Sequence, residues 1–332
     1  MVAPPVLAAA AYAASLIFAC IVSGFQQTTI EVPLAGQLEI SQGVFKIAPG
    51  VFMPLIANGI SRNHSVWLAS GGRHIDTAFW YGDAQQAAVG EAIAASGIPR
   101  ADLFITTKVA CCPTERCSSF CDSPPNPVRA STANVTEQLE RSLALLGLQQ
   151  ADLVLLHNPC SRPEDTAAAY AALEAAHARG LARAIGVSNL NASALAALLE
   201  VATVPPAVNQ CSLSIAGHPA AHDGVGTTCL EGSRLYGADG ETVRFSAQRG
   251  IAFAAYSPLG SISKVDVLGH AEVQAVARAK GKTAAQVALR WLVQQGITAV
   301  TATSNAEHAA EALDVFSFAL TQGEMRRLSR IR

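Results

Sequence analysis

The stretch Gly71-Gly-Arg-His-Ile-Asp-Thr-Ala-Phe-Trp-Tyr-Gly82 places a carboxylate, Asp76, at the end of a strand-like segment and a phenol, Tyr81, five residues later. Two further polar residues, Lys108 and His157, each end a later strand-like run. A carboxylate, a phenol, an ammonium group and an imidazole can all take part in proton transfer. The four strand-end residues therefore predict a catalytic site.

Strand-like runs alternate with Ala- and Leu-rich helical patterns through most of the chain. The eight runs lie at about 53–58, 74–78, 103–108, 153–157, 184–187, 207–210, 252–256 and 298–302. Alternating β and α units predict a parallel sheet, and eight such units favour a closed barrel over a doubly wound sheet. No G-x-G-x-x-G follows the first strand, which disfavours a dinucleotide-binding doubly wound fold.

The segment before the barrel predicts a β-hairpin, because Val44 to Met53 forms two short apolar runs around Pro49-Gly50. Two segments, 111–127 and 212–240, are longer than a tight barrel needs, and both follow strand ends on the face where barrel enzymes build their sites. The predicted fold is α/β, a (β/α)8 TIM barrel with an N-terminal β-hairpin and two long loops at the C-terminal face. Residues 1–24 are expected to be a hydrophobic leader, 25–42 a connector and 43–332 the barrel domain.

Four more motifs follow in order along the chain: Gly186-Val-Ser-Asn189, Val208-Asn-Gln210, Ala255-Tyr-Ser-Pro-Leu-Gly260 and Gly281-Lys-Thr-Ala-Ala-Gln-Val-Ala-Leu-Arg-Trp291. With these motifs and the four strand-end residues, the chain from about residue 40 to its end resembles the aldo-keto reductase family. The resemblance implies reduction of aldehydes or ketones to alcohols by direct hydride transfer from a nicotinamide cofactor, without a metal. It also maps the catalytic tetrad of the family onto Asp76, Tyr81, Lys108 and His157.

The chemistry of the four residues agrees with that mapping. Tyr81 is expected to be the general acid, with Lys108 lowering its pKa from about 10 by favouring the phenolate. Asp76 would hold Lys108, and His157 would orient the carbonyl oxygen. Taken singly, each residue also has a purely structural interpretation. Asp76 could cap the next helix, and Tyr81 could be a core aromatic. Lys108 could be a surface charge, and His157 a hydrogen-bonded histidine at a strand end. Taken together at one barrel mouth, they favour catalysis.

The resemblance also implies which residues bind the cofactor. They are Ser188, Asn189, Gln210, Tyr256, Ser257, Leu259, Thr303, Ser304, Asn305, His308 and Glu311. The polar side chains suit a carboxamide and phosphates, and the Tyr256 ring offers a face on which a nicotinamide can stack. Where the family carries a Lys and an Arg against the 2'-phosphate of NADPH, this chain has Ala302 and His308. We therefore expect NADP(H) first and NAD(H) as the alternative.

The bulk composition limits the class of partner. The chain has 332 residues, half of them hydrophobic, and a formal net charge of -2, so no basic excess attracts nucleic acid. We expect a monomer that acts on a small-molecule carbonyl substrate. Of eight cysteines, four crowd the segment Cys111 to Cys121 without the paired spacing of structural zinc sites. Disulfides or unpaired loop thiols are the expected alternatives.

The first residues raise the question of a membrane. Val6 to Gly24 is an uncharged apolar stretch of 19 residues, which predicts a signal peptide or a transmembrane anchor rather than a core helix. The expected location is the secretory pathway, lumenal or secreted, or a membrane to which residues 6–24 attach the domain. If the leader is not used, the cytoplasm is expected.

Two other functions stay open at this point. One is a catalytically idle, cofactor-binding barrel that acts as a redox-sensing or membrane-complex subunit. The other is an extracellular module that binds partners through long loops held by disulfide bonds. The presence of all four tetrad residues favours the reductase.

Overall fold

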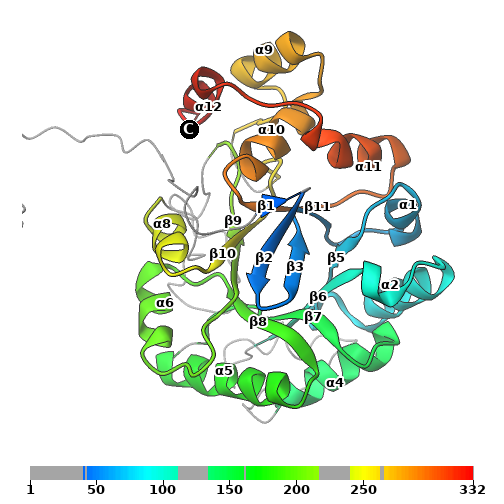
Figure 1. Cartoon of the computed structure of the whole chain (residues 1–332), viewed down its shortest axis with the longest axis vertical. Coiled ribbons are helices and arrows are strands. Elements are labelled where there is room, and N and C mark those ends of the chain that lie inside the picture. Colours follow the sequence, from blue (N-terminus) through cyan, green and yellow to red (C-terminus); the bar gives the residue numbers. More distant parts are fainter. Residues whose placement is uncertain are drawn as a thin grey trace, which may run out of the picture.

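The computed structural model describes residues 40–41, 43–110, 134–160, 162–216, 240–261 and 265–331. Its centre is a closed barrel of parallel strands in the order β10-β11-β4-β5-β6-β7-β8-β9 (Figure 1). The strands are β4 (Ile56–Asn58), β5 (His74–Asp76), β6 (Phe104–Val109), β7 (Ala151–Leu156), β8 (Ala182–Ser188), β9 (Val208–Ser212), β10 (Ala252–Tyr256) and β11 (Thr298–Thr301). The predicted eight-stranded barrel is confirmed.

A small antiparallel sheet lies across one end of the barrel (Figure 1). The predicted hairpin is confirmed as β2 (Val44–Ala48) and β3 (Val51–Pro54), and β1 (Ile40–Ser41), which was not predicted, pairs with β2. The predicted run 53–58 is divided between two strands, β3 ending at Pro54 and β4 beginning at Ile56, and between them the Leu55 N–H still donates to the Gly43 carbonyl of the hairpin.

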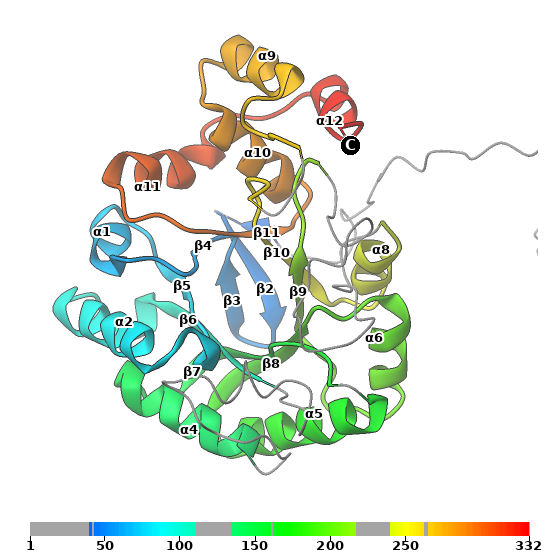
Figure 2. The same ribbon diagram turned by 180° about the vertical axis from the view of Figure 1, so that it is seen from behind.

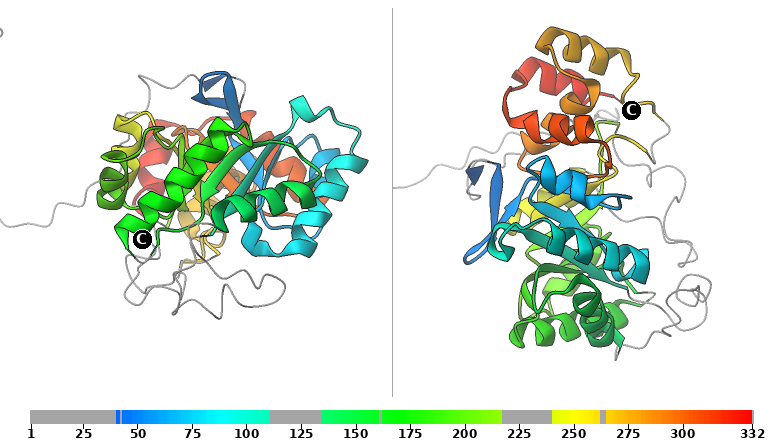
Figure 3. Two further views of the ribbon diagram at one scale, coloured as in Figure 1. Left: turned by 90° about the horizontal axis from the view of Figure 1, so that it is seen from below. Right: turned by 90° about the vertical axis from the view of Figure 1, so that its right-hand side faces the viewer.

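Helices surround the barrel, as Figure 2 shows from behind and Figure 3 from two sides. They are α1 (His64–Ala69), α2 (Asp83–Ala95), α4 (Asn134–Leu146), α5 (Pro163–Ala178), α6 (Ala192–Leu199), α8 (Gly240–Gln248), α9 (Ala271–Lys280), α10 (Ala284–Val293), α11 (Ala306–Leu313) and α12 (Gln322–Leu328). Short 3₁₀ turns lie at Phe79–Tyr81, Arg100–Asp102 and Asp314–Phe316. In the motif Gly281 to Trp291, a left-handed glycine ends α9 and a Thr283–Gln286 capping box begins α10.

The barrel strands are covered on both faces, which explains their nearly continuous apolar sequence. Every residue of β6 and β7 is buried. Just before β5, the ring of Trp67 occupies the space beside Gly72, where a Cβ atom would lie 2.2 Å from the indole. Glycine is therefore required there, and this close packing fixes where β5 begins and where Asp76 ends it.

The membrane prediction needs correction. Within the parts of the chain that the structure describes, no helix is both long and apolar enough to cross a membrane. The transmembrane segment expected at residues 6–24 lies outside those parts, so the transmembrane assignment has no support from the described residues. The expected signal peptide and the cysteine-rich segment from Cys111 to Cys121 also lie outside the described residues.

Candidate active site

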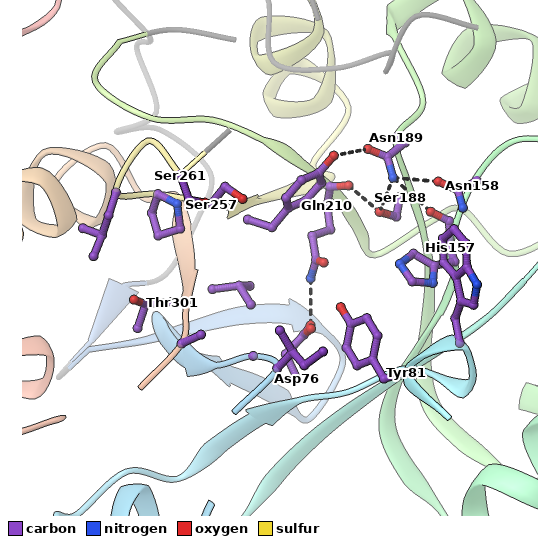
Figure 4. Close-up of a pocket in the computed structure, with 18 residues that line it drawn as sticks. Asp76, Tyr81, His157, Asn158, Ser188, Asn189, Gln210, Ser257, Ser261 and Thr301 are labelled. Atoms are coloured by element: carbon purple, nitrogen blue, oxygen red, sulfur yellow. Dashed lines mark hydrogen bonds between the residues drawn. The ribbon is translucent and has the colours of Figure 1, made fainter. Parts of the chain in front are cut away.

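A cavity of about 500 Å³ opens at the carboxyl ends of the barrel strands. Its lining runs from Asp76 and Tyr81 past His157 to Tyr256 and Ala302, so nearly every part of the barrel contributes a wall (Figure 4). This volume is within the range of about 300–1,000 Å³ typical of ligand sites. The cavity is on the face that the loops after the strands were predicted to shape.

Asp76 and Lys108 form a buried ion pair at the floor of the cavity. Both side chains are 1% exposed, and the Lys108 Nζ donates to Asp76 Oδ1 and, at 3.1 Å, to the Thr77 carbonyl. The other carboxylate oxygen, Oδ2, accepts from Gln210 Nε2 at 2.8 Å. Both oxygens of Asp76 are thus hydrogen-bonded, which a buried charge requires.

Tyr81 lies beside this pair. It ends the 3₁₀ turn after β5, and the next residue, Gly82, has a φ of 89° that turns the chain into α2. The Lys108 Nζ lies 5.4 Å from the centroid of the Tyr81 ring. The turn after β5 therefore brings the Tyr81 ring close to the ammonium group of Lys108, which is on β6.

The electrostatics of Tyr81 differ from the prediction. Burial raises the pKa of Tyr81 above 10.0, the Lys108 ammonium opposes the rise by charge and hydrogen bonding, and Asp76 adds to it. Lys108 therefore lowers the pKa of the phenol as expected, but burial outweighs it and the net pKa of Tyr81 is raised. Burial lowers the pKa of Lys108, but Asp76 and Tyr81 outweigh it and the net pKa is raised above 10.5. At neutral pH the pair is a protonated phenol next to a charged ammonium group.

His157 follows β7 directly, and its ring contacts the Tyr81 ring, which also lies beside Lys108. Its ring makes edge-to-face contacts with Trp80 at 5.1 Å and with Tyr81 at 6.0 Å between centroids. Burial, and next the charge of Lys108, hold the pKa of His157 well below 6.5, so the imidazole is neutral. Its Nδ1 is buried without a hydrogen-bond partner among the described residues.

Asn189 joins several of the predicted cofactor residues in one network. It has a left-handed φ of 62°, and its Nδ2 donates to the His157 carbonyl at 3.0 Å and to Ser188 Oγ at 3.1 Å. Its Oδ1 accepts from the Tyr256 hydroxyl at 2.9 Å. Because the protein already occupies its amide, Asn189 supports the site rather than offering a free hydrogen-bonding group.

Gln210 is better placed to meet a cofactor carboxamide. Its Nε2 is held by Asp76, and its Oε1 has no partner within the described parts of the chain. An amide oxygen at the cavity wall is the acceptor that a nicotinamide carboxamide N–H needs. Ser257, with a φ of 53°, and Leu259 also line the cavity beside the Tyr256 ring. The residues at this end of the cavity fit a nicotinamide.

The other predicted cofactor residues lie further away. Five of them do not line the cavity: Thr303, Ser304, Asn305 and His308 lie around the N-terminus of α11, and Glu311 lies in its last turn. Asn305 caps the helix, and its Oδ1 accepts from the backbone N–H groups of Glu307 and His308. Two of the amide groups that could bind a phosphate are therefore already paired.

Some wall residues were not predicted. Trp80 and Asn158 directly flank predicted catalytic residues in the sequence, and Gly59, Ile60 and Thr301 lie at other strand ends. Trp80 and Asn158 could have been predicted as wall residues because they adjoin Tyr81 and His157 in the sequence. For the others, their strand-end position was the only signal, and many residues share it.

Comparison with known proteins relates this geometry to a family. A model of the Aldo/keto reductase family matches residues 65–332. An aldo-keto reductase of Mycolicibacterium smegmatis is 37% identical over 268 residues, covering 81% of this chain and 80% of that protein. A D-galacturonate reductase of Fragaria ananassa is 32% identical, covering 80% of this chain and 78% of its own length.

Solved structures show the same likeness. An aldo-keto reductase from a deep-sea metagenome library superposes with a TM-score of 0.68 at 28% identity, covering 85% of this chain and 92% of that chain. A Bombyx mori aldo-keto reductase solved in complex with NADP gives a TM-score of 0.68 at 25% identity, covering 88% of this chain and 94% of that chain.

Proposed function

This chain belongs to the aldo/keto reductase family, and on that premise we propose that Tyr81 protonates the substrate oxygen during carbonyl reduction. Its family chemistry is NAD(P)H-dependent reduction of small carbonyl compounds. The observation that most supports the role of Tyr81 is its position between the buried Asp76–Lys108 ion pair and the imidazole of His157 at the wall of the cavity.

Reduction places negative charge on the carbonyl oxygen, which a nearby acid must neutralise. A nicotinamide cofactor, when bound, supplies the hydride. The raised pKa of Tyr81 keeps the phenol protonated at neutral pH, so the proton is present when it is needed. After the proton leaves, the Lys108 ammonium stabilises the phenolate, and Asp76 keeps that ammonium in place.

His157 has a different role in this proposal. A neutral imidazole carries one N–H, so it can donate a hydrogen bond to the carbonyl oxygen without adding a second positive charge beside Lys108. Its edge-to-face contacts with Trp80 and Tyr81 hold the ring at the cavity wall. Tyr81 and His157 would then bind the same substrate oxygen from two sides.

We propose NADP(H) as the cofactor. Gln210 Oε1 and the ring of Tyr256 would hold the nicotinamide, with Ser257 and Leu259 beside it. The relative solved with NADP supports this choice. Ala302 and His308 stand where the family resemblance expects cations, so NAD(H) is the alternative cofactor, and discrimination between the two is expected to be weak.

The test is the Tyr81→Phe variant, which keeps the ring and removes only the acid. With a panel of aldehydes, we expect kcat/KM to fall by about 10²- to 10⁴-fold, the range for losing a general acid. Cofactor binding, followed by fluorescence quenching on NADPH addition, should be retained in the variant. Equal, measurable rates for the two proteins would reject the acid role of Tyr81. A wild-type protein that binds NADPH but reduces no aldehyde above background would instead favour a catalytically idle, cofactor-binding barrel.

A further inference from the structure

Asn158 borders the cavity directly after His157, at the end of β7, and is half-buried (Figure 4). It is not one of the residues predicted from sequence. The Nδ2 of Asn189 donates to Asn158 Oδ1 at 3.0 Å. Asn158 is therefore tied to the network beneath the site through its oxygen atom.

The orientation of the Asn158 amide follows from a chain of hydrogen bonds. The backbone carbonyl of His157 can only accept, so the Asn189 atom 3.0 Å from it must be the nitrogen, Nδ2. That same nitrogen also lies 3.0 Å from Asn158 and 3.1 Å from Ser188 Oγ, so its two hydrogens are shared among three contacts. Because an amide nitrogen cannot accept a hydrogen bond, the Asn158 atom that it meets is the acceptor, Oδ1. The amide nitrogen of Asn158, Nδ2, therefore takes no part in the contact with Asn189.

The Nδ2 of Asn158 has no hydrogen-bond acceptor among the residues that the structure describes. A partly buried N–H donor that loses water when a ligand enters must find an acceptor on that ligand or lose binding energy. An oxygen on the substrate would satisfy it. An aliphatic substrate would leave it unpaired.

The described part of the cavity wall carries no net charge. Among the described wall residues, Asp76 is the one with a formal charge at neutral pH, and Lys108 neutralises it. The neighbouring groups, Trp80 and the neutral His157, present aromatic surface. A wall with one amide donor and an aromatic side chain suits a neutral molecule that has both C–H groups and oxygen atoms.

We propose that Asn158 is a specificity-determining residue that donates a hydrogen bond to an oxygen close to the reacting carbonyl of the substrate. The preferred substrates are neutral carbonyl compounds with a hydroxyl, alkoxy or second carbonyl oxygen near that carbon, rather than plain aliphatic aldehydes. This inference rests on the proposed carbonyl reduction at the same site. Asn158 adjoins His157 in the chain, and Asn189 donates to the His157 carbonyl and to Asn158 Oδ1, so the Asn158 amide is held beside the imidazole that faces the reacting carbonyl.

The experiment compares methoxyacetaldehyde with butanal, which differ by one ether oxygen in place of a CH₂ group. An ether oxygen can accept a hydrogen bond but cannot donate one, so it reports specifically on the Asn158 donor. Two variants of the full chain are used. Asn158→Leu has nearly the same shape and removes the whole amide. Asn158→Asp keeps an acceptor for Asn189, removes the donor and adds a negative charge, so agreement between the two variants is what assigns the effect to the donor. The measured quantity is the ratio of kcat/KM for methoxyacetaldehyde to kcat/KM for butanal. The difference in intrinsic reactivity between the two aldehydes is the same in every protein, so it cancels when the ratio of a variant is divided by that of the wild type.

We expect the methoxyacetaldehyde to butanal ratio to fall by about tenfold in both variants, the effect of losing one hydrogen bond. A ratio unchanged in both variants would overturn the inference and leave the proposed reduction intact. If the wild-type protein reduces neither aldehyde, nor any other in the panel, with NADPH or NADH, the proposed function itself fails, and this inference fails with it. Thermal unfolding of each variant establishes that it is folded, and the Asp variant decides the case if the Leu variant is not.

Discussion

Gln210 donates a 2.8 Å hydrogen bond to Asp76 although 134 residues separate them in the chain. Strands β9 and β5, which carry them, are not neighbours in the barrel, so the bond crosses its interior. It completes the hydrogen bonding of a carboxylate that is 1% exposed. The residue expected to hold the cofactor thus also holds the ion pair beneath Tyr81.

Replacing Gln210 should therefore affect stability as well as cofactor binding. Gln210→Met leaves Asp76 Oδ2 buried without a donor, which should lower the free energy of unfolding by about 1.5–3 kcal/mol, as for other hydrogen bonds to charged groups. Urea denaturation measures this change. Gln210→Glu, which places a second carboxylate beside Asp76, should be less stable still at neutral pH. A Met variant as stable as the wild type would contradict the structural role of this bond.

The Asp76–Lys108 pair should behave as a coupled unit. Asp76→Leu or Lys108→Met alone leaves one buried charge uncompensated and should cost about 3–5 kcal/mol of unfolding free energy. The double variant removes both charges, so its loss should be clearly smaller than the sum of the two single losses. The double-mutant cycle is read by urea denaturation. Additive losses would mean that the two groups are solvated independently.

Cofactor choice should respond to a single cation at the edge of the cavity. Ala302 is exposed, lines the cavity and stands where the resemblance expects a lysine. Ala302→Lys should tighten NADPH binding by about tenfold and leave NADH binding unchanged, because only NADPH has a 2'-phosphate to pair with. Fluorescence titration with each cofactor measures the two dissociation constants. Equal tightening of both would indicate that the lysine meets the pyrophosphate instead.

Acid should destabilise the protein partly through His64. This side chain is 3% exposed and contacts Asn58 and Gln85, which are uncharged, and burial lowers its pKa to about 4. A histidine with a lowered folded-state pKa stabilises the fold above its unfolded pKa of 6.5, and this contribution is lost as the pH falls toward 4. The loss should be about 3 kcal/mol.

The unfolding free energy of His64→Gln should accordingly decline less than that of the wild type between pH 6.5 and pH 4. Burial also lowers the pKa values of His74 and His157, so these two histidines should still make the unfolding free energy of the variant depend on pH. His308→Gln, a change at an exposed histidine, is the matched control and should follow the wild-type curve. Parallel curves for the wild type and the His64 variant would exclude His64 as a source of acid sensitivity.

The opposite end of the barrel should matter for stability alone. Asp152 is fully buried and pairs with Arg100 and with Arg183, both at 2.7 Å, and Arg183 also donates to the Gly50 carbonyl in the hairpin turn. Asp152→Asn should lower the free energy of unfolding by about 3 kcal/mol, because two arginines lose their buried partner. Reductase kinetics of the folded variant should be unchanged. A specific loss of kcat/KM would mean that this network reaches the active site.

The positions of the catalytic candidates were predictable because each ends a strand. In a parallel barrel all strands end at one rim, so Asp76, Lys108 and His157 had to converge once the eight β/α units were recognised. The hairpin was predictable from Pro49-Gly50 for a similarly local reason. The division of the run 53–58 was not predictable, because its two parts pair with different strands, β3 with β2 and β4 with β11, and these partners are set by the tertiary fold.

The sequence by itself determined the barrel, the family and the convergence of the catalytic candidates at its mouth, since strand and helix periodicity and the order of motifs are local properties of the chain. Only the tertiary structure decided how those side chains are used. The raised pKa of Tyr81, the occupied amide of Asn189 and the left-over amide nitrogen of Asn158 depend on burial and on partners distant in sequence. Desolvation and long-range hydrogen bonding arise only when the barrel closes.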